Sequence, residues 1–258
     1  MNITHVRNAT LIVEYADKKF LIDPMLGEKG SFPPFPNAPR DNQNNPLIEL
    51  PMSVNEIITG ADAVILTHLH LDHFDEAAQK SLPIDIKIYT QNSEDAEEVK
   101  NVGFTDVEAL EDTNQIGDIQ VIKTPGQHGR GDIVKIAGKV CGLIFQHDNE
   151  KSLYIAGDTV WYEEVEKTLR TFNPEIIVVN GGDNQFNEGG SLVMDENDIY
   201  EVAKLMPSSE IIVVHMEAVN HWNLSREYLK QFAKEKQFSS QLKVPNDGDK
   251  YTFLNNEN

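Results

Sequence analysis

The segment VILTHLHLDHFDEAAQK, residues 64–80, constrains the fold of this chain more than any other stretch. It begins as a short apolar strand and runs directly into His68, His70, Asp72, His73 and Asp75. Aspartate is rarely buried unless it is paired, and histidine is a common metal ligand. The strand therefore ends either in a solvated loop or in part of a metal site whose other ligands come from elsewhere in the chain.

The spacing of these residues favours the metal site. His68, His70 and Asp72 alternate, so in an extended segment their side chains project to one side. His73 follows directly, near the start of a helix expected from about Phe74, and must point elsewhere. One short segment is thus predicted to supply two ligands to one metal ion and two to a neighbour. A catalytic ion needs further ligands and keeps one position for water.

Three further segments end in residues of the metal-binding type. DIQVIKTPGQH delivers His128 through a glycine turn, SLYIAGD places Asp158 directly after a strand, and EIIVVH does the same for His215. Sites in α/β proteins lie beyond the carboxyl ends of strands. The alternatives are roles as satisfied surface or core residues for the histidines, as we expect for His5 and His147, and helix capping by Asp158. Four independent strand ends favour a dinuclear metal site over these alternatives.

Each half of the chain begins with hairpin strands and then alternates strands with helices. We expect strands at 9–15, 20–23, 61–68, 84–89, 118–125, 132–138, 140–146, 152–158, 175–182 and 210–215. We expect helices at 75–82, 92–103, 160–172, 195–206 and 225–236, the last with Ser225 as its N-cap. Two such halves can pack sheet against sheet with their helices outside. No linker splits the chain, so residues 1–258 are expected to form one domain.

Residues 27–51 contain six of the 12 prolines, which excludes a helix or a central strand there. A loop of this length in a compact domain is either disordered or functional. Phe32 and Phe35 favour an ordered flap over a linker.

Charge and composition narrow the functional classes. Lys and Arg number 22 against 42 Asp and Glu, a formal charge of −20 that disfavours nucleic acid and anionic membranes as partners. The lone cysteine, Cys141, is expected to be a buried, inert thiol. The N-terminus lacks the layout of a signal peptide, and no apolar run approaches the roughly 20 residues that span a bilayer. We therefore expect a cytoplasmic protein.

The motif THLHLDH resembles the H-x-H-x-D-H motif of the metallo-β-lactamase fold superfamily. FLIDP, GQHG, GDT and VVH follow the order expected for that superfamily over nearly the whole chain. The resemblance implies an α/β fold, an αββα four-layer sandwich with two metal ions at one edge. It implies a first metal ion held by His68, His70 and His128. It implies a second held by Asp72, His73 and His215, with Asp158 bridging the two and Asp23 orienting the motif by hydrogen bonding.

Within the superfamily, the chain is most similar to the branch that contains the ascorbate-6-phosphate lactonases. It departs from the antibiotic-hydrolysing lactamases, many of which carry cysteine at the second metal, so β-lactamase activity is not expected. Some relatives have a G-H-A or G-H-S element near the N-terminus, where this chain has Asn8 in RNAT.

The expected reaction is hydrolysis of a small-molecule substrate. Two cations lower the pKa of a bridging water from about 15.7 towards 7 and polarise a carbonyl or phosphoryl oxygen. We expect the resulting bridging hydroxide to cleave a small ester, lactone or amide. Zinc is the expected metal for both sites, and manganese is its main competitor. The alternatives are hydrolysis of a small phosphodiester by the same chemistry and a non-catalytic metal-binding sensor or scaffold.

Four residues are candidates for roles beyond metal binding. Asp72 is a candidate proton donor to the leaving group, besides being a ligand. His221, six residues after His215, is either an electrophile or proton donor at the open side of the site or a surface histidine. Trp161 and Tyr162 either contact the substrate or belong to the core. The sequence leaves open whether the protein forms a homo-oligomer.

Overall fold

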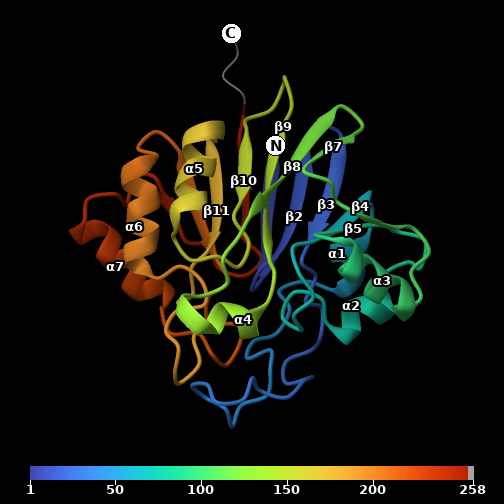
Figure 1. The fold of residues 1–258 in the computed structure, drawn as a ribbon, viewed down its shortest axis with the longest axis horizontal. Helices are drawn as coiled ribbons and strands as arrows, with labels where there is room; N and C mark the ends of the chain where they lie inside the picture. The colour runs from blue at the N-terminus through green and yellow to red at the C-terminus, as the bar shows by residue number, and fades with distance from the viewer. Residues whose placement is uncertain (255–258) are drawn as a thin grey trace.

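Two seven-stranded sheets form the centre of the protein (Figure 1). The computed structural model describes residues 1–254. The first sheet has the order β14-β1-β2-β3-β4-β5-β6, formed by Lys250–Thr252, Asn2–Arg7, Thr10–Tyr15, Lys18–Ile22, Ala63–Leu66, Lys87–Thr90 and Val107–Ala109. The second has the order β13-β12-β11-β10-β9-β8-β7, formed by Leu242–Lys243, Glu210–Val214, Ile176–Asn180, Leu153–Ile155, Cys141–Gln146, Ile119–Pro125 and Thr113–Ile116.

Each sheet changes from antiparallel to parallel pairing along its width. Strands β1, β2 and β3 pair antiparallel, and β3 to β6 pair parallel. In the second sheet β7 to β10 pair antiparallel, and β10 to β13 pair parallel. Hairpins join antiparallel neighbours, whereas parallel neighbours need longer crossover connections. The predicted plan of two halves, each with hairpins first and strand–helix alternation afterwards, is confirmed.

Helices cover the outer faces of both sheets, which gives the four layers of the αββα sandwich (Figure 1). On the first sheet they are α1 (Val54–Ile58), α2 (Glu76–Ser81) and α3 (Ser93–Val102). On the second they are α5 (Glu163–Phe172), α6 (Glu196–Leu205) and α7 (Arg226–Glu235). Ser225 caps α7 as predicted, its hydroxyl accepting from the Tyr228 amide at 3.2 Å. Within residues 1–254, no helix is long and apolar enough to cross a bilayer.

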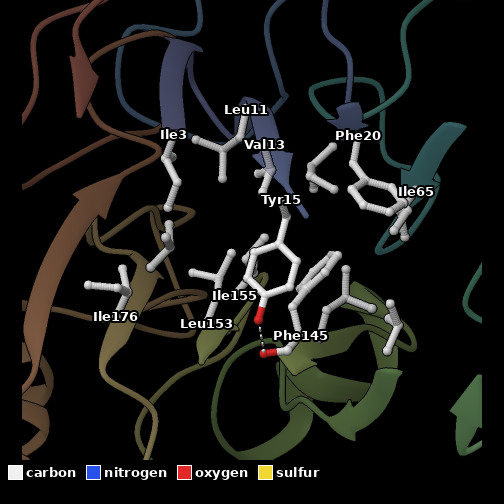
Figure 2. Packing of buried hydrophobic residues seen from close by; sticks show 14 of the residues in the cluster. Ile3, Leu11, Val13, Tyr15, Phe20, Ile65, Phe145, Leu153, Ile155 and Ile176 are labelled. Carbon is white, nitrogen blue, oxygen red and sulfur yellow. Dashed lines mark hydrogen bonds between the residues drawn. The ribbon is translucent and has the colours of Figure 1, made fainter. Parts of the chain in front are cut away.

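The core between the sheets fixes their relative position (Figure 2). Side chains of β1 and β2 point towards those of β9 and β10, and the Tyr15 ring lies 5.6 Å from the ring of Phe145. The Tyr15 hydroxyl donates to the Phe145 carbonyl at 3.2 Å. Each large apolar side chain buried here contributes roughly 1.5–3 kcal/mol. Because the sheets are locked face to face, the ends of their strands meet at one edge.

Two secondary-structure predictions need correction. Residues 132–138 are not a strand but a 3-10 turn, η1 (Gly131–Ile133), followed by α4 (Val134–Ala137). Ile133, Ile136 and Ala137 follow the i, i+3, i+4 spacing of a helix, which so short a segment does not separate clearly from strand alternation. The helix predicted at 160–172 begins only at Glu163.

Residues 27–51 form an ordered flap, as the two phenylalanines predicted. Phe32 and Asn45 exchange backbone hydrogen bonds of 2.9 and 2.8 Å. The Asn220 side chain donates to the carbonyls of Phe35 and Pro39 and accepts from the Phe35 amide. The Asn45 amide group also donates to Asn220 Oδ1 at 2.9 Å. The flap is therefore tied to the segment that follows β12.

Candidate metal centre and active site

Four strand ends converge at one edge of the sandwich. Strand β4 leads to His68, β8 to His128, β10 to Asp158 and β12 to His215. All four side chains are buried. Asp158 Oδ2 lies 3.5 Å from His128 Nε2, 3.7 Å from His215 Nε2 and 3.8 Å from His68 Nε2. Asp158 does not cap a helix, because the N-cap of α5 is Tyr162.

The ligand-type side chains form two groups around Asp158. The first group is formed by His68, His70 and His128, and the second by Asp72, His73 and His215. Within each group the ligand atoms lie within 4.8 Å of one another. In the first group, His68 Nε2 lies 3.0 Å from His70 Nδ1. In the second, His73 Nε2 lies 3.2 Å from His215 Nε2 and 3.2 Å from Asp158 Oδ2. The chain thus brings together the two sets of residues that the resemblance implied, with one carboxylate oxygen near both.

The motif segment itself is a turn, so the extended conformation expected from its alternation is wrong. The amides of His73 and Phe74 both donate to the His70 carbonyl at 2.9 Å. Asp75 ends the turn as the N-cap of α2, its carboxylate accepting from the Ala78 amide at 2.8 Å. Because the chain turns, Asp72 and His73 reach His215, while the His73 ring also lies 4.0 Å from the ring of His68 and forms a further ligand-type group with Asp23 and His68.

Asp23, directly after β3, orients the motif as predicted. Its carboxylate accepts from the Thr67 amide at 2.7 Å, from the Thr67 hydroxyl at 2.6 Å and from His73 Nδ1 at 2.9 Å. A carboxylate only accepts, so His73 donates from Nδ1, and its Nε2 is the nitrogen left for a metal ion. Because the Thr67 hydroxyl donates to Asp23, it accepts from His68 Nδ1 at 3.1 Å. His68 therefore also presents a bare Nε2, and Thr67 is a positioning residue that sequence reasoning missed.

Two more contacts orient ligand-type side chains, and neither was found from the sequence. His128 Nδ1 donates to the Leu192 carbonyl at 2.9 Å, which again leaves Nε2 bare. The Asn180 side chain, at the end of β11, donates to Asp158 Oδ1 at 2.5 Å and leaves Oδ2 towards the histidines. Asn180 ends a strand as His215 does, so its position at the close of EIIVVN was the available signal.

Asn8 links the two halves of the second group. Its side chain donates to the Asp72 carbonyl at 3.0 Å, and its own carbonyl accepts from the His215 amide at 2.8 Å. The residue has a φ of 56°, in the left-handed region that asparagine tolerates better than most residues. Asn8 stands in the place of the G-H-A or G-H-S element of some relatives. Its hydrogen bonds hold the backbone of Asp72 and of His215, two residues of the ligand type.

The charges of the centre call for a cation. Burial opposes ionisation of Asp158, but the charges of His73 and His215 hold its pKa well below the ordinary value. Burial likewise opposes protonation of His73, yet Asp158, Asp72 and Asp23 hold its pKa well above the ordinary value. The paired imidazole nitrogens of His68 and His70, and of His73 and His215, lie 3.0 and 3.2 Å apart. That separation is close to the one expected for two histidine ligands about 2.0–2.1 Å from the same metal ion. The residues present therefore fit the binding of divalent metal ions.

A cavity of about 300 Å³ opens onto this centre. His70, Asp72, His128, Asp158 and His221 line it together with apolar side chains, namely Phe35, Leu69, Leu71, Ile136, Ala137, Phe186 and Leu192. His221 is buried between the edge of Phe35, with ring centroids 4.6 Å apart, and the face of Phe186, 6.1 Å away. Burial lowers the pKa of His221 to about 3, so the ring is neutral near pH 7. The surface role considered for His221 is wrong.

Trp161 and Tyr162 do not line this cavity. Both pack against the apolar cluster under α5, α6 and α7. Of the two roles expected for them, the structure places them in the core.

Cys141 is buried as predicted, and burial raises the pKa of its thiol.

Comparison with known proteins agrees with the fold and the site. A family model described as "Beta-lactamase superfamily domain" matches residues 18–216. The UPF0173 protein YddR of Bacillus subtilis (strain 168) is 58% identical over 254 residues, which cover 98% of this chain and 100% of that protein. A UPF0173 metal-dependent hydrolase of Koribacter versatilis (strain Ellin345) is 28% identical over 60% of this chain and 65% of its own.

Solved structures give the same result and also cover nearly the whole chain. The isothiocyanate hydrolase from Delia radicum gut bacteria superposes with a TM-score of 0.94 and 41% identity, over 98% of this chain and 99% of that one. A possible metal-dependent hydrolase from Veillonella parvula DSM 2008 has a TM-score of 0.95 and 35% identity over the same shares. These relatives favour an enzyme over a sensor or scaffold. The chain belongs to the β-lactamase superfamily and is a metal-dependent hydrolase with the metallo-β-lactamase fold.

Proposed function

We propose that the protein is a dinuclear metal-dependent hydrolase of small, uncharged electrophiles. The observation that carries the proposal is the pair of ligand groups around Asp158 at the base of a cavity with apolar walls. His68, His70 and His128 would hold one ion, Asp72, His73 and His215 the other, and Asp158 would contact both. When bound, two such ions supply a water of lowered pKa and an electrophile for the substrate. Zinc suits these ligands best, with manganese as the competitor.

The protein's own residues orient the histidine ligands, exclude bulk water from the site and offer a hydrogen-bond donor to the substrate. Asp23, Thr67 and the Leu192 carbonyl hold three histidines with Nε2 towards the centre. Phe35 and Phe186 on either side of His221 exclude bulk water, which strengthens every electrostatic interaction in the site. A neutral His221 offers one ring N–H to a substrate heteroatom. Asp72 also lines the cavity and is positioned to return a proton to the leaving group.

An isothiocyanate is the substrate that these features favour. Esters, lactones, amides and isothiocyanates all present an uncharged carbon to water, so the metal chemistry alone does not separate them. The relative that hydrolyses isothiocyanates is 41% identical over nearly the full length of both chains. The reaction would be R–N=C=S + H₂O → R–NH₂ + COS: water oxygen bonds to the carbon, the C–N bond breaks, and both water protons end on the amine. Among the described residues that line the cavity there is no lysine or arginine, which argues against a phosphodiester.

The test is a hydrolysis screen of the zinc- and manganese-loaded protein against methyl and butyl isothiocyanate, a γ-lactone, a simple ester and a small phosphodiester. Each assay has a chelator-treated control. We expect chelator-sensitive loss of the isothiocyanate with release of the amine. Turnover of the lactone or ester alone would overturn the isothiocyanate assignment, and chelator-resistant turnover would overturn the metal mechanism.

Asp158→Ala tests the carboxylate shared by the two groups. Loss of an outer partner of a ligand typically costs 10–100-fold, so loss of a shared ligand should lower turnover by more than about 100-fold. Metal content, measured by elemental analysis, should fall with it. Asp106→Ala, which removes an exposed carboxylate paired with Lys87, is the matched control and should change neither.

A further inference from the structure

A second cavity, of about 820 Å³, adjoins the cavity at the metal centre. Ile136 and Phe186 line both cavities, so these two side chains form the boundary between them. The second cavity, called here the outer cavity, is also lined by Pro36, Arg130 and Ile133 and, at its exposed side, by Asp132 and Glu188. Nothing in the chemistry of the metal centre requires this space.

The two cavities run along the same three segments of chain. The flap contributes Phe35 to the inner cavity and Pro36 and Asn37 to the outer one. Segment 133–137 and the loop that begins near Phe186 also contribute to both. The Asn187 amide donates to the Asn37 carbonyl at 2.7 Å, which joins the flap to that loop beside the outer cavity. The two cavities are therefore neighbours, and a path from the metal centre into the outer cavity would pass between Ile136 and Phe186.

Three side chains of the outer cavity, those of Ile133, Ile136 and Phe186, offer an apolar surface to an occupant. Ile136 is 77% exposed, an unusual exposure for a large apolar side chain, and it is placed where an occupant would cover it. Arg130 in the outer cavity is not a free cation, because its Nη2 contacts both carboxylate oxygens of Asp198 at 2.7 and 2.6 Å. An anionic group would have to compete with that carboxylate, whereas an alkyl or aryl group would gain by covering Ile133, Ile136 and Phe186.

We propose that the outer cavity binds an extended apolar substituent of the substrate. In this arrangement, which rests on the proposed function, the reacting carbon lies at the metal centre. Its alkyl or aryl substituent passes between Ile136 and Phe186. The substrate class is then a small electrophile with a long apolar tail, such as hexyl or 2-phenylethyl isothiocyanate, rather than a compact one. Ile136 and Phe186 are specificity-determining residues.

The experiment measures kcat/KM of the metal-loaded protein for methyl, butyl and hexyl isothiocyanate. Each buried methylene is worth about a fourfold gain, so the kcat/KM for hexyl, with two more methylenes, should exceed that for butyl by about 15-fold. A carboxylate in the wall would be desolvated by the tail, so Ile136→Asp should bring the kcat/KM for hexyl isothiocyanate to within about twofold of that for butyl isothiocyanate. Because Ile136 is largely exposed, this variant should fold. Ile84→Asp, the same change at a residue that is 61% exposed and lines neither cavity, should retain the full advantage of hexyl.

A binding measurement separates this inference from the proposed function. 1-Butanol and 1-hexanol are not hydrolysed, and their dissociation constants are measured by calorimetry on the same three proteins. We expect hexanol to bind about 15-fold more tightly than butanol, except in Ile136→Asp. Equal kcat/KM for butyl and hexyl in the native protein, or a hexyl advantage that survives in Ile136→Asp, would overturn the inference but not the hydrolase. If no isothiocyanate is turned over, the proposed substrate fails, and the alkanol series alone supports or overturns the outer cavity.

Discussion

Replacing Asp23 by asparagine removes a negative charge from the metal centre without changing the size of the side chain. In the native protein, Oδ1 accepts from the Thr67 amide, and Oδ2 accepts from both the Thr67 hydroxyl and His73 Nδ1. An amide offers one oxygen and one NH₂ group. In either orientation of the amide, at least one of these three donors then faces another donor.

The size of the effect follows from burial. Asp23 is 1% exposed, so a donor that loses its partner is not rescued by bulk water. Such a donor costs about 1–3 kcal/mol. In a protein of this size, that lowers the melting temperature of the metal-bound form by about 2–4 °C for each kcal/mol. Because His73 is no longer held with Nε2 towards the centre, metal affinity should fall by about 10–100-fold.

Metal affinity is measured by competition with a chromogenic chelator, and stability by scanning calorimetry of the metal-bound protein. Asp106→Asn changes the charge equally at an exposed site on the first sheet and should leave both values unchanged. Native metal affinity in Asp23→Asn would refute the view that Asp23 sets the orientation of His73 and, through Thr67, of His68.

Three further substitutions test other parts of the structure. Asn8 has a φ of 56°, so Asn8→Ala should lower the free energy of unfolding by about 1 kcal/mol more than Asn8→Gly, and the reverse order in denaturant titrations would contradict the strain argument. Asn220→Ala removes the hydrogen bonds that hold the flap, so limited proteolysis within 27–51 should be faster and KM higher, with metal content unchanged; native proteolysis rates would argue against the tether. Cys141→Ala should cost about 1–2 kcal/mol of stability with native turnover, because the thiol is buried, and inactivity at full metal content would show instead that it takes part in the reaction.

Much of the fold and of the site could be predicted from the sequence because the signals are local. Apolar runs that end in His68, His128, Asp158 and His215 reveal strands whose carboxyl ends carry ligand-type residues. The order of hairpins and strand–helix units in each half predicts two sheets with helices outside. The prediction of the ligand-bearing strand ends and the prediction of the two sheets each depend only on residues that are neighbours along the chain. Neither requires knowing which residues far apart in the sequence contact one another.

The tertiary structure decided everything that depends on contacts between distant segments. Thr67 and Asn180 look ordinary in the sequence, and they become positioning residues only because β3 lies beside β4 and β11 beside β10. Trp161 and Tyr162 follow Asp158 directly, yet they pack into the helix layer, because the chain turns away from the edge before α5. Residues 132–138 are apolar enough for a strand, but they form η1 and α4 beside the cavity, in the connection between β8 and β9, which pair with each other. Sequence therefore determined which side chains could bind metal, and packing determined which of their atoms face the centre and what shape of substrate could reach it.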